Sequence, residues 1–410
     1  MKKIIKYEFR KFFNKRKNKL LIFILLAFVL GVNIYNYRQY KNYKDNFVQE
    51  YKLISERANT KLTVLNEELS ARSTLDKNEN MIEEIEKMEG EVEYLNMEAP
   101  VSGRIANAYI KAEEDPEWNR LLVKYLSERY TNTVDSYEKG YIDDIYLSER
   151  KTNIQEVKYY KYKYDYFMEN SIPFQLNEYK PTGANTLNLL FQKNNILIMV
   201  FIIILLSMDI FLSSVMEGSY KLEYTQPFER KDIFWGKLIC ILSIVFILLV
   251  FIFILNFIIN TILFGIGEFY YPQIVSSTIN KLTLKSNEGN FKIIPLKNKI
   301  FLGVLMLITL VFLSIGLIIF LSIFTDSLEK TLGISIVLII AAFTFNEIGN
   351  KNSIINLLYP YMYCFYENVI SGFYRYNYLW GITMNITLSI LFIFISYIKF
   401  KNKDFLGARE

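Results

Sequence analysis

The chain has 410 residues, with 47 lysines and arginines against 42 aspartates and glutamates, so its formal net charge is +5. It contains no histidine and only two cysteines, Cys240 and Cys364, which excludes a Ser-His-Asp triad, a histidine-ligated metal, a zinc ribbon and a disulfide scaffold. Apolar residues make up 52% of the chain and gather in blocks. The average composition therefore combines apolar segments with charged ones.

Six apolar segments are candidates for helices that cross a bilayer, whose core requires about 20 apolar residues. Several uncharged runs of this length are rare in soluble proteins, so we expect an all-α polytopic membrane protein with six transmembrane helices. The fifth segment would form only about 21 Å of helix, which is too short for a bilayer core of about 30 Å. The segments are residues 20–37, 196–215, 236–264, 300–325, 332–345 and 379–398.

The basic residues predict the orientation of these spans. Residues 2–19 contain nine lysines and arginines and a single acid, Glu8. The positive-inside rule places this end in the cytoplasm, and six spans return residues 399–410 to the same side. The segments 38–195, 265–299 and 346–378 are then extracellular. We therefore expect a multi-pass protein of the cell membrane, which would be the plasma membrane of a bacterium.

Residues 1–19 also carry an apolar stripe at helical spacing, formed by Ile4, Ile5, Phe9, Phe12 and Phe13. Basic residues occupy much of the remaining surface. This combination favours an amphipathic helix that lies in the membrane interface. The alternative is a topology signal without defined structure.

The segment 38–195 is predicted to be a mainly helical extracellular domain. Over residues 38–193 it has 22 basic and 28 acidic residues, a net charge of −6. Apolar residues between Leu62 and Leu95 follow spacings of three and four, which predicts a helical hairpin or short coiled coil that ends near Pro100. Residues 159–166 alternate tyrosine with lysine, which indicates either helix packing with interfacial anchoring or a ligand-binding surface.

The cytoplasmic loop 216–237 is rich in charged and aromatic residues. Gly218 permits a sharp exit from the second span, and Pro227 stops a short helix over residues 219–225. Asp232 stands near the positive N-terminal end of the third span. These features suit either docking to a cytoplasmic partner or a plain hairpin loop.

Three motifs of this loop stand in order: Glu217-Gly218, Thr225-Gln226-Pro227-Phe228-Glu229-Arg230 and Lys237. With the basic N-terminal arm, the large insert after the first span and a Lys-Asp-Phe tail at residues 403–405, they make the chain resemble the membrane subunit of an ATP-binding-cassette (ABC) transporter of the type-2 exporter class. Phe228-Glu229 departs from the small residues usual before this arginine. The resemblance implies an ATPase-coupling loop with Glu217, Gly218, Tyr220, Lys221, Tyr224, Thr225, Pro227, Arg230 and Lys237.

The family resemblance also implies a re-entrant outer hairpin between the fifth and sixth spans, within residues 346–378. Leu357-Leu358-Tyr359-Pro360-Tyr361 lies where the family has it. Such a segment would cover the short fifth span, because irregular backbone at membrane depth must be packed in protein or face water.

Two residues form a possible intramembrane polar site. Asp209 lies in the second span, and it either belongs to a substrate or proton path or pairs with a basic residue near the inner surface. Asn256 in the third span, like Asn260 and Asn385, is also interpreted as an interhelical hydrogen-bond partner.

No Gly-x-x-x-x-Gly-Lys-Ser/Thr loop occurs, so the chain is predicted not to be an enzyme and to hold no metal or cofactor. The resemblance implies a separate cytoplasmic ABC ATPase that carries ATP and magnesium, and a homodimer or heterodimer of permeases. Membrane lipid, and not nucleic acid, is the expected partner of the basic arm.

The predicted function is ATP-driven export of an amphipathic or hydrophobic substrate, such as an antimicrobial peptide or drug. The alternative is a non-transporting sensor or scaffold whose extracellular domain binds a ligand.

Overall fold

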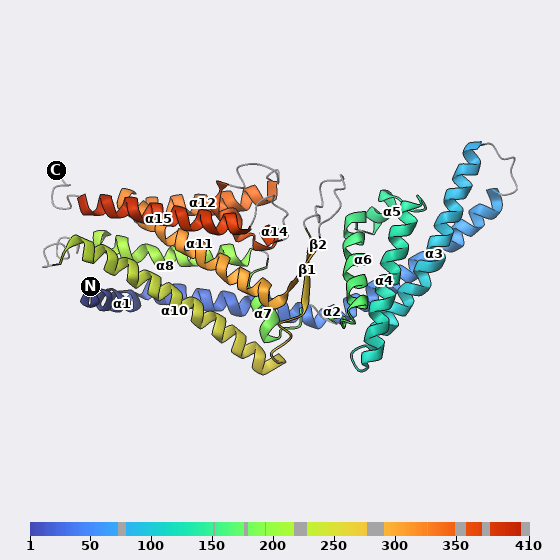
Figure 1. The fold of residues 1–410 in the computed structure, drawn as a ribbon, viewed down its shortest axis with the longest axis horizontal. Coiled ribbons are helices and arrows are strands. Elements are labelled where there is room, and N and C mark those ends of the chain that lie inside the picture. The colour runs from blue at the N-terminus through green and yellow to red at the C-terminus, as the bar shows by residue number, and fades with distance from the viewer. Residues whose placement is uncertain are drawn as a thin grey trace. The chain divides into compact units, whose positions relative to one another are not determined.

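A computed structural model shows a protein built almost entirely of helices (Figure 1). The structure describes residues 1–72, 79–150, 152–175, 179–192, 194–216, 228–276, 291–325, 327–348, 358–370 and 378–402. In chain order the elements are α1 (Lys2–Asn14), α2 (Arg16–Arg72), α3 (Glu79–Lys111), α4 (Pro116–Glu138), α5 (Asp144–Glu149), α6 (Ile154–Glu169), α7 (Gly183–Leu189), α8 (Asn195–Met216), α10 (Arg230–Phe264), β1 (Pro272–Ser276), β2 (Phe291–Pro295), α11 (Leu296–Thr325), α12 (Leu328–Ile348), η1 (Pro360–Cys364), α14 (Tyr366–Ile370) and α15 (Tyr378–Asn402).

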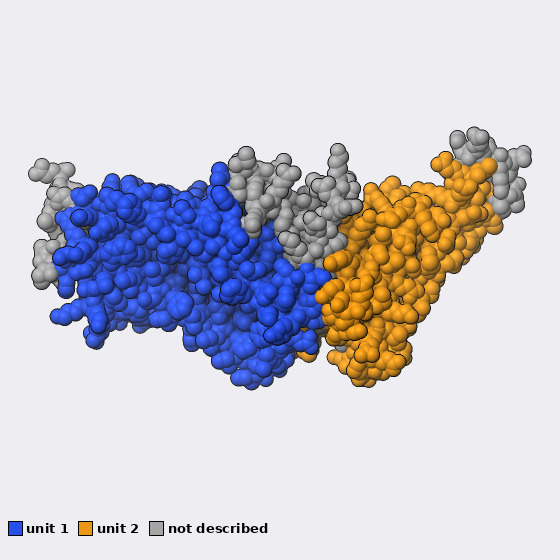
Figure 2. Space-filling model, in the orientation of Figure 1, with its two compact units in different colours: residues 1–35, 181–275, 293–410 blue, residues 36–180, 276–292 orange. Residues whose placement is uncertain are grey.

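The chain divides into two compact units (Figure 2). Unit 1 comprises residues 1–35, 181–275 and 293–410, and unit 2 comprises residues 36–180 and 276–292. The predicted insert, residues 38–195, overlaps unit 2 without coinciding with it, because α7 belongs to unit 1.

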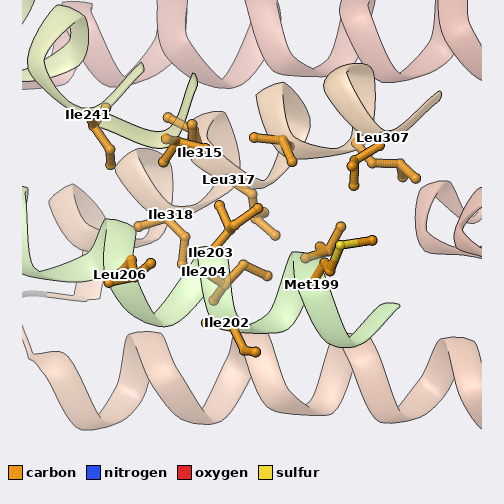
Figure 3. Close-up of a cluster of buried hydrophobic side chains, with 14 of the residues drawn as sticks. Met199, Ile202, Ile203, Ile204, Leu206, Ile241, Leu307, Ile315, Leu317 and Ile318 are labelled. Atoms are coloured by element: carbon orange, nitrogen blue, oxygen red, sulfur yellow. The ribbon is translucent and has the colours of Figure 1, made fainter. Parts of the chain in front are cut away.

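Unit 1 is a helical bundle around α11, which is the most enclosed of its span candidates and packs against α15, α8 and α12. Aliphatic side chains of α8 and α11 interdigitate along their length, and α10 adds to the same core (Figure 3). Between apolar helices such close packing replaces the hydrophobic effect as the source of stability. The labelled core residues are Met199, Ile202, Ile203, Ile204, Leu206, Ile241, Leu307, Ile315, Leu317 and Ile318.

Small residues let α11 and α15 approach closely. A Cβ atom on Gly316 would lie 3.0 Å from the carbonyl oxygen of Ser389, so a larger residue would push the helices apart. The Ser389 hydroxyl donates to the Phe312 carbonyl across the same crossing, at 2.8 Å. Both features are typical of helix pairs in membranes.

Among the described residues, five helices are long and apolar enough to cross a membrane. They lie in α2, α10, α11, α12 and α15, and correspond to predicted spans one, three, four, five and six. The predicted second span lies in α8, whose apolar described part runs over Asn195–Met208.

The predicted fifth span was too short. Helix α12 runs over Leu328–Ile348, which is 21 residues or about 31 Å of helix. The sequence-based limits stopped at polar residues near both ends, but Thr331 is buried and its hydroxyl donates to the Ser327 carbonyl, so the helix continues through it.

The segment after α12 that was expected to form a re-entrant hairpin contains the short helices η1 and α14, and residues 361–364 are buried. Its tyrosine hydroxyls donate to carbonyls of the bundle: Tyr359 to Leu338 in α12, and Tyr366 to Lys299 in α11. These bonds satisfy buried polar groups and hold the segment to the bundle. Residues 349–357 and 371–377 of the predicted hairpin lie outside the described residues.

The all-α prediction needs one correction. The predicted outer loop 265–299 contains strands β1 and β2, which form a two-stranded sheet. Both strands carry adjacent β-branched residues, Ile274-Val275 and Ile293-Ile294, which favour extended backbone.

Unit 2 is built from the charged part of α2 and from α3, α4, α5 and α6. Leu65 of α2 and Leu95 of α3 share one buried core, with Leu62, Met88 and Val92 against it, which confirms the predicted hairpin. The predicted break at Pro100 is wrong, because α3 continues through it to Lys111.

The tyrosine-lysine run lies on α6 and packs against α4. Tyr130 of α4 stacks on Tyr160 and Tyr164 of α6, with ring centroids 5.1 and 5.6 Å apart. Tyr164 is buried and Tyr162 is exposed. Much of the run therefore serves helix packing, the first of its two interpretations.

A buried ion cluster lies inside unit 2. Glu98 of α3 is fully buried, and its Oε1 accepts hydrogen bonds from Arg129 of α4 at 2.9 Å and from Arg150 at 2.7 Å. Burial alone would raise the pKa of Glu98, but the two arginines outweigh it and hold the pKa below its usual range.

Candidate coupling site at the start of α10

The structure describes two of the nine residues predicted for the coupling loop, Arg230 and Lys237, which both lie in the first turns of α10. The other seven, Glu217, Gly218, Tyr220, Lys221, Tyr224, Thr225 and Pro227, lie outside the described residues.

Helix α10 begins six residues earlier than the predicted span, at Arg230. Glu229 is its N-cap residue in extended conformation, and Asp232 lies in the first turn, where an acid favours the positive helix end. Lys231 forms an exposed ion pair with Glu229 at 2.7 Å and lowers the pKa of the Glu229 carboxyl through a hydrogen bond. The sequence-based limit counted only apolar residues and so left out this charged first turn.

The first turns of α10 contact α15 and α8. The Arg230 Nη1 donates to the Lys401 carbonyl at the end of α15, at 2.9 Å. Phe234 is fully buried, with ring centroids 5.5 Å from Phe400 of α15 and 5.8 Å from Phe211 of α8. Any displacement of this end of α10 therefore acts on two other helices of the bundle.

The next residues of α10 contact α1. Gly236 packs directly on Ile4, since a Cβ atom there would lie 2.9 Å from the Ile4 Cγ2. One residue on, the Lys237 Nζ lies 3.8 Å from the Glu8 Oε1, and the two side chains are only 2% and 4% exposed. A buried pair of opposite charges fixes the position of α1 on α10, because separation would leave each charge in an apolar environment.

The contact of Glu8 with Lys237 was not predicted from the sequence. The available signal was the position of Glu8, which is the only acid among nine basic residues and shares a helix face with Ile4 and Phe12 at spacings of four. All three are buried in the structure. The helix predicted over residues 1–19 is present as α1, but part of its apolar stripe packs on α10 and α8. Phe13 is exposed.

Replacement of Gly236 by Val is expected to destabilise the α1–α10 contact by about 1–3 kcal/mol, since the added methyl groups overlap Ile4. Thermal unfolding of the purified chain measures the loss, and Ile4→Ala in the same background should recover part of it. The matched control is Gly333→Val in α12, where no atom lies within 4 Å of the Cβ position. Equal losses at the two glycines would contradict the close contact.

The two residues of the predicted intramembrane polar site lie in different helices. Asp209 is in α8, and its side chain lies outside the described part of the structure. Asn256 in α10 accepts a hydrogen bond from the Asn33 Nδ2 of α2 at 2.7 Å. The Asn385 Nδ2 of α15 lies 3.5 Å from the Thr309 Oγ1 of α11.

The start of α10 brings charged and aromatic side chains of four helices together. Within the described ranges, no three histidine, cysteine or acidic residues lie close enough together to hold a metal ion. Cys240 and Cys364 are buried free thiols. The charged and aromatic groups of the site contact one another, and they link four helices at one end of the bundle.

Comparison with protein families gives a match to the ABC-2 family transporter protein over residues 3–404, nearly the whole chain. The chain belongs to the ABC-2 transporter family. It is therefore a multi-pass membrane permease of an ABC transporter, and family membership implies an ABC ATPase subunit as its partner. No curated protein and no solved structure matches the chain.

Proposed function

We propose that this ABC-2 permease exports an amphipathic or hydrophobic substrate, driven by a separate ATPase that docks on residues 216–237. One observation carries the proposal: α10, whose first eight residues form the end of this loop, contacts α1, α8 and α15 through those residues. A force applied to the loop by a closing ATPase would reach four helices at once.

The direction and the substrate follow from charge and surface. The nine basic residues before the first span support cytoplasmic termini and an extracellular position for the larger part of unit 2. The walls of the bundle are apolar, which suits an antimicrobial peptide or a drug. Export for immunity or efflux is the activity that fits the proposed orientation and the apolar bundle.

The chain itself binds no cofactor in this proposal. ATP and magnesium reside on the partner ATPase, and two permeases, identical or different, combine with two ATPases. Lipid headgroups contact the basic face of α1, where Lys2, Lys6 and Arg10 are exposed.

The test compares ATPase activity in reconstituted complexes. Replacement of residues 220–224 by Gly-Ser, or Arg230→Gln, is expected to reduce permease-stimulated ATP hydrolysis at least tenfold and to leave membrane insertion intact. The matched control is Arg230→Lys, which keeps the charge close to the Lys401 carbonyl.

Unchanged stimulation in both variants would remove the coupling assignment. If the tagged chain, purified from its native membrane, carries no ATPase subunit, export fails as the function and the sensor alternative replaces it.

A further inference from the structure

An amide cluster joins α2 to α10. The Asn33 Nδ2 of α2 donates to the Asn256 Oδ1 of α10 at 2.7 Å, and the Asn260 Nδ2 donates to the Asn256 carbonyl at 2.7 Å. Asn256 and Asn260 are only 2% and 3% exposed. The cluster is polar but uncharged, since residues 20–37 and 238–264 contain no aspartate, glutamate, lysine or arginine.

Hydrogen-bonding capacity in this cluster is left over. The Asn33 Oδ1 and the Asn256 Nδ2 are buried and have no hydrogen-bond partner among the described residues. Buried polar groups without partners are unfavourable, and more so at membrane depth. The pair therefore leaves one acceptor on α2 and one donor on α10 for a further partner.

The free groups define the chemistry of that partner. Asn33 offers an acceptor and Asn256 offers a donor, and their amides are already linked by one hydrogen bond. A peptide group has one N–H donor and one C=O acceptor, so it complements this pair. A charged ligand would find no counter-charge on the apolar spans of α2 and α10.

Apart from this amide pair, the backbones of α2 and α10 approach closely at few points in the described structure. The apolar part of α2 is mostly exposed. Gly31, two residues before Asn33, has no atom within 4 Å of its Cβ position. Separation of the helices would open the amide cluster to a passing chain.

We propose that Asn33 and Asn256 bind a backbone peptide group of the transported molecule, which identifies the substrate as a neutral, apolar peptide. The inference rests on the proposed export function and narrows its substrate class.

The test measures peptide binding by the chain in lipid nanodiscs, without an ATPase. The probe is a neutral apolar decapeptide with a diazirine-bearing leucine, compared with its analogue N-methylated at every peptide bond. We expect saturable photo-crosslinking to the wild type, with about tenfold weaker binding of the N-methylated peptide, because its N–H donors are gone. This comparison requires no variant and is therefore independent of any folding defect.

Two variants locate the site. Asn33→Leu and Asn256→Leu should weaken binding of the unmethylated peptide by about tenfold and reduce the difference between the two peptides. The matched control is Asn385→Leu: Asn385 is also fully buried, and its Oδ1 has no hydrogen-bond partner among the described residues.

Three results would overturn the inference: no saturable crosslinking to the wild type, equal binding of the two peptides, or equal losses in the three variants. Each leaves the coupling of ATP hydrolysis to the loop 216–237 untouched, since that coupling is measured without the peptide. Failure of the ATPase test with intact peptide binding would remove the proposed function and not the site.

Discussion

Replacement of Lys237 by Met is expected to destabilise unit 1 by about 3–5 kcal/mol, because it removes the buried positive charge that lies 3.8 Å from the buried Glu8 carboxylate. The purified chain should unfold at lower temperature in detergent. Helix α1 should also leave α10, so that trypsin cleaves residues 15–19 faster. The lower unfolding temperature and the faster cleavage should be accompanied by weaker stimulation of the partner ATPase, since α1 no longer moves together with α10.

The double variant Glu8→Gln with Lys237→Met separates charge from packing. It removes both charges, and should recover most of the stability that Lys237→Met loses, because paired polar groups are often replaced at little cost when neither charge remains. The control is Lys231→Met, whose partner Glu229 is exposed, with an expected change below about 1 kcal/mol. Equal effects of Lys237→Met and Lys231→Met would show that the buried pair has no special role.

Replacement of Glu98 by Gln should have a similar effect on unit 2, with a loss of about 3–5 kcal/mol, because it removes the buried charge that pairs with the partly buried Arg129 and Arg150. Trp118 is the only tryptophan of unit 2, so its fluorescence reports urea unfolding in the full chain once Trp235 and Trp380 are replaced by Phe. The matched control is Glu113→Gln, since the exposed pair with Lys44 contributes about 1 kcal/mol or less.

The same cluster predicts a pH dependence. The pKa of Glu98 is lower in the folded chain than its usual value, so its contribution to stability is complete above that value. This contribution falls as the pH decreases from the usual glutamate value of 4.5 through the lower pKa of the folded state. Between pH 7 and pH 3 the wild type should lose more stability than Glu98→Gln. Parallel losses would contradict the lowered pKa.

The spans could be predicted from the sequence because hydropathy depends on local composition alone. Their ends could not, because polar residues continue a helix when the fold supplies partners. Thr331 lies in α12 and donates to the carbonyl of Ser327, just before the helix, and Arg230 lies in α10 and donates to the carbonyl of Lys401 in α15. Pro100 was expected to end α3 because proline is a local helix breaker, but α3 continues through Pro100 among the other helices of unit 2.

The candidate site was only partly predictable. Arg230 and Lys237, named from the family motif, both lie at the start of α10, and their role in coupling stays a prediction. The partner of Lys237 is a tertiary contact, and the sequence assigned no role to Glu8 beyond its being the single acid of a basic arm. Only the packing of Ile4 on Gly236 brings the two charges together, and no pattern within either segment encodes this contact.

The contact between Glu8 and Lys237 also has a consequence for biosynthesis. The two residues are 229 positions apart (237 − 8), and the chain is made from its N-terminus, so α1 and all of unit 2 up to residue 180 leave the ribosome before Lys237 exists. Until then Glu8 has no access to the lysine that pairs with it in the finished fold. Docking of α1 is therefore a late step of assembly, and only a chain completed at least through the start of α10 can acquire it.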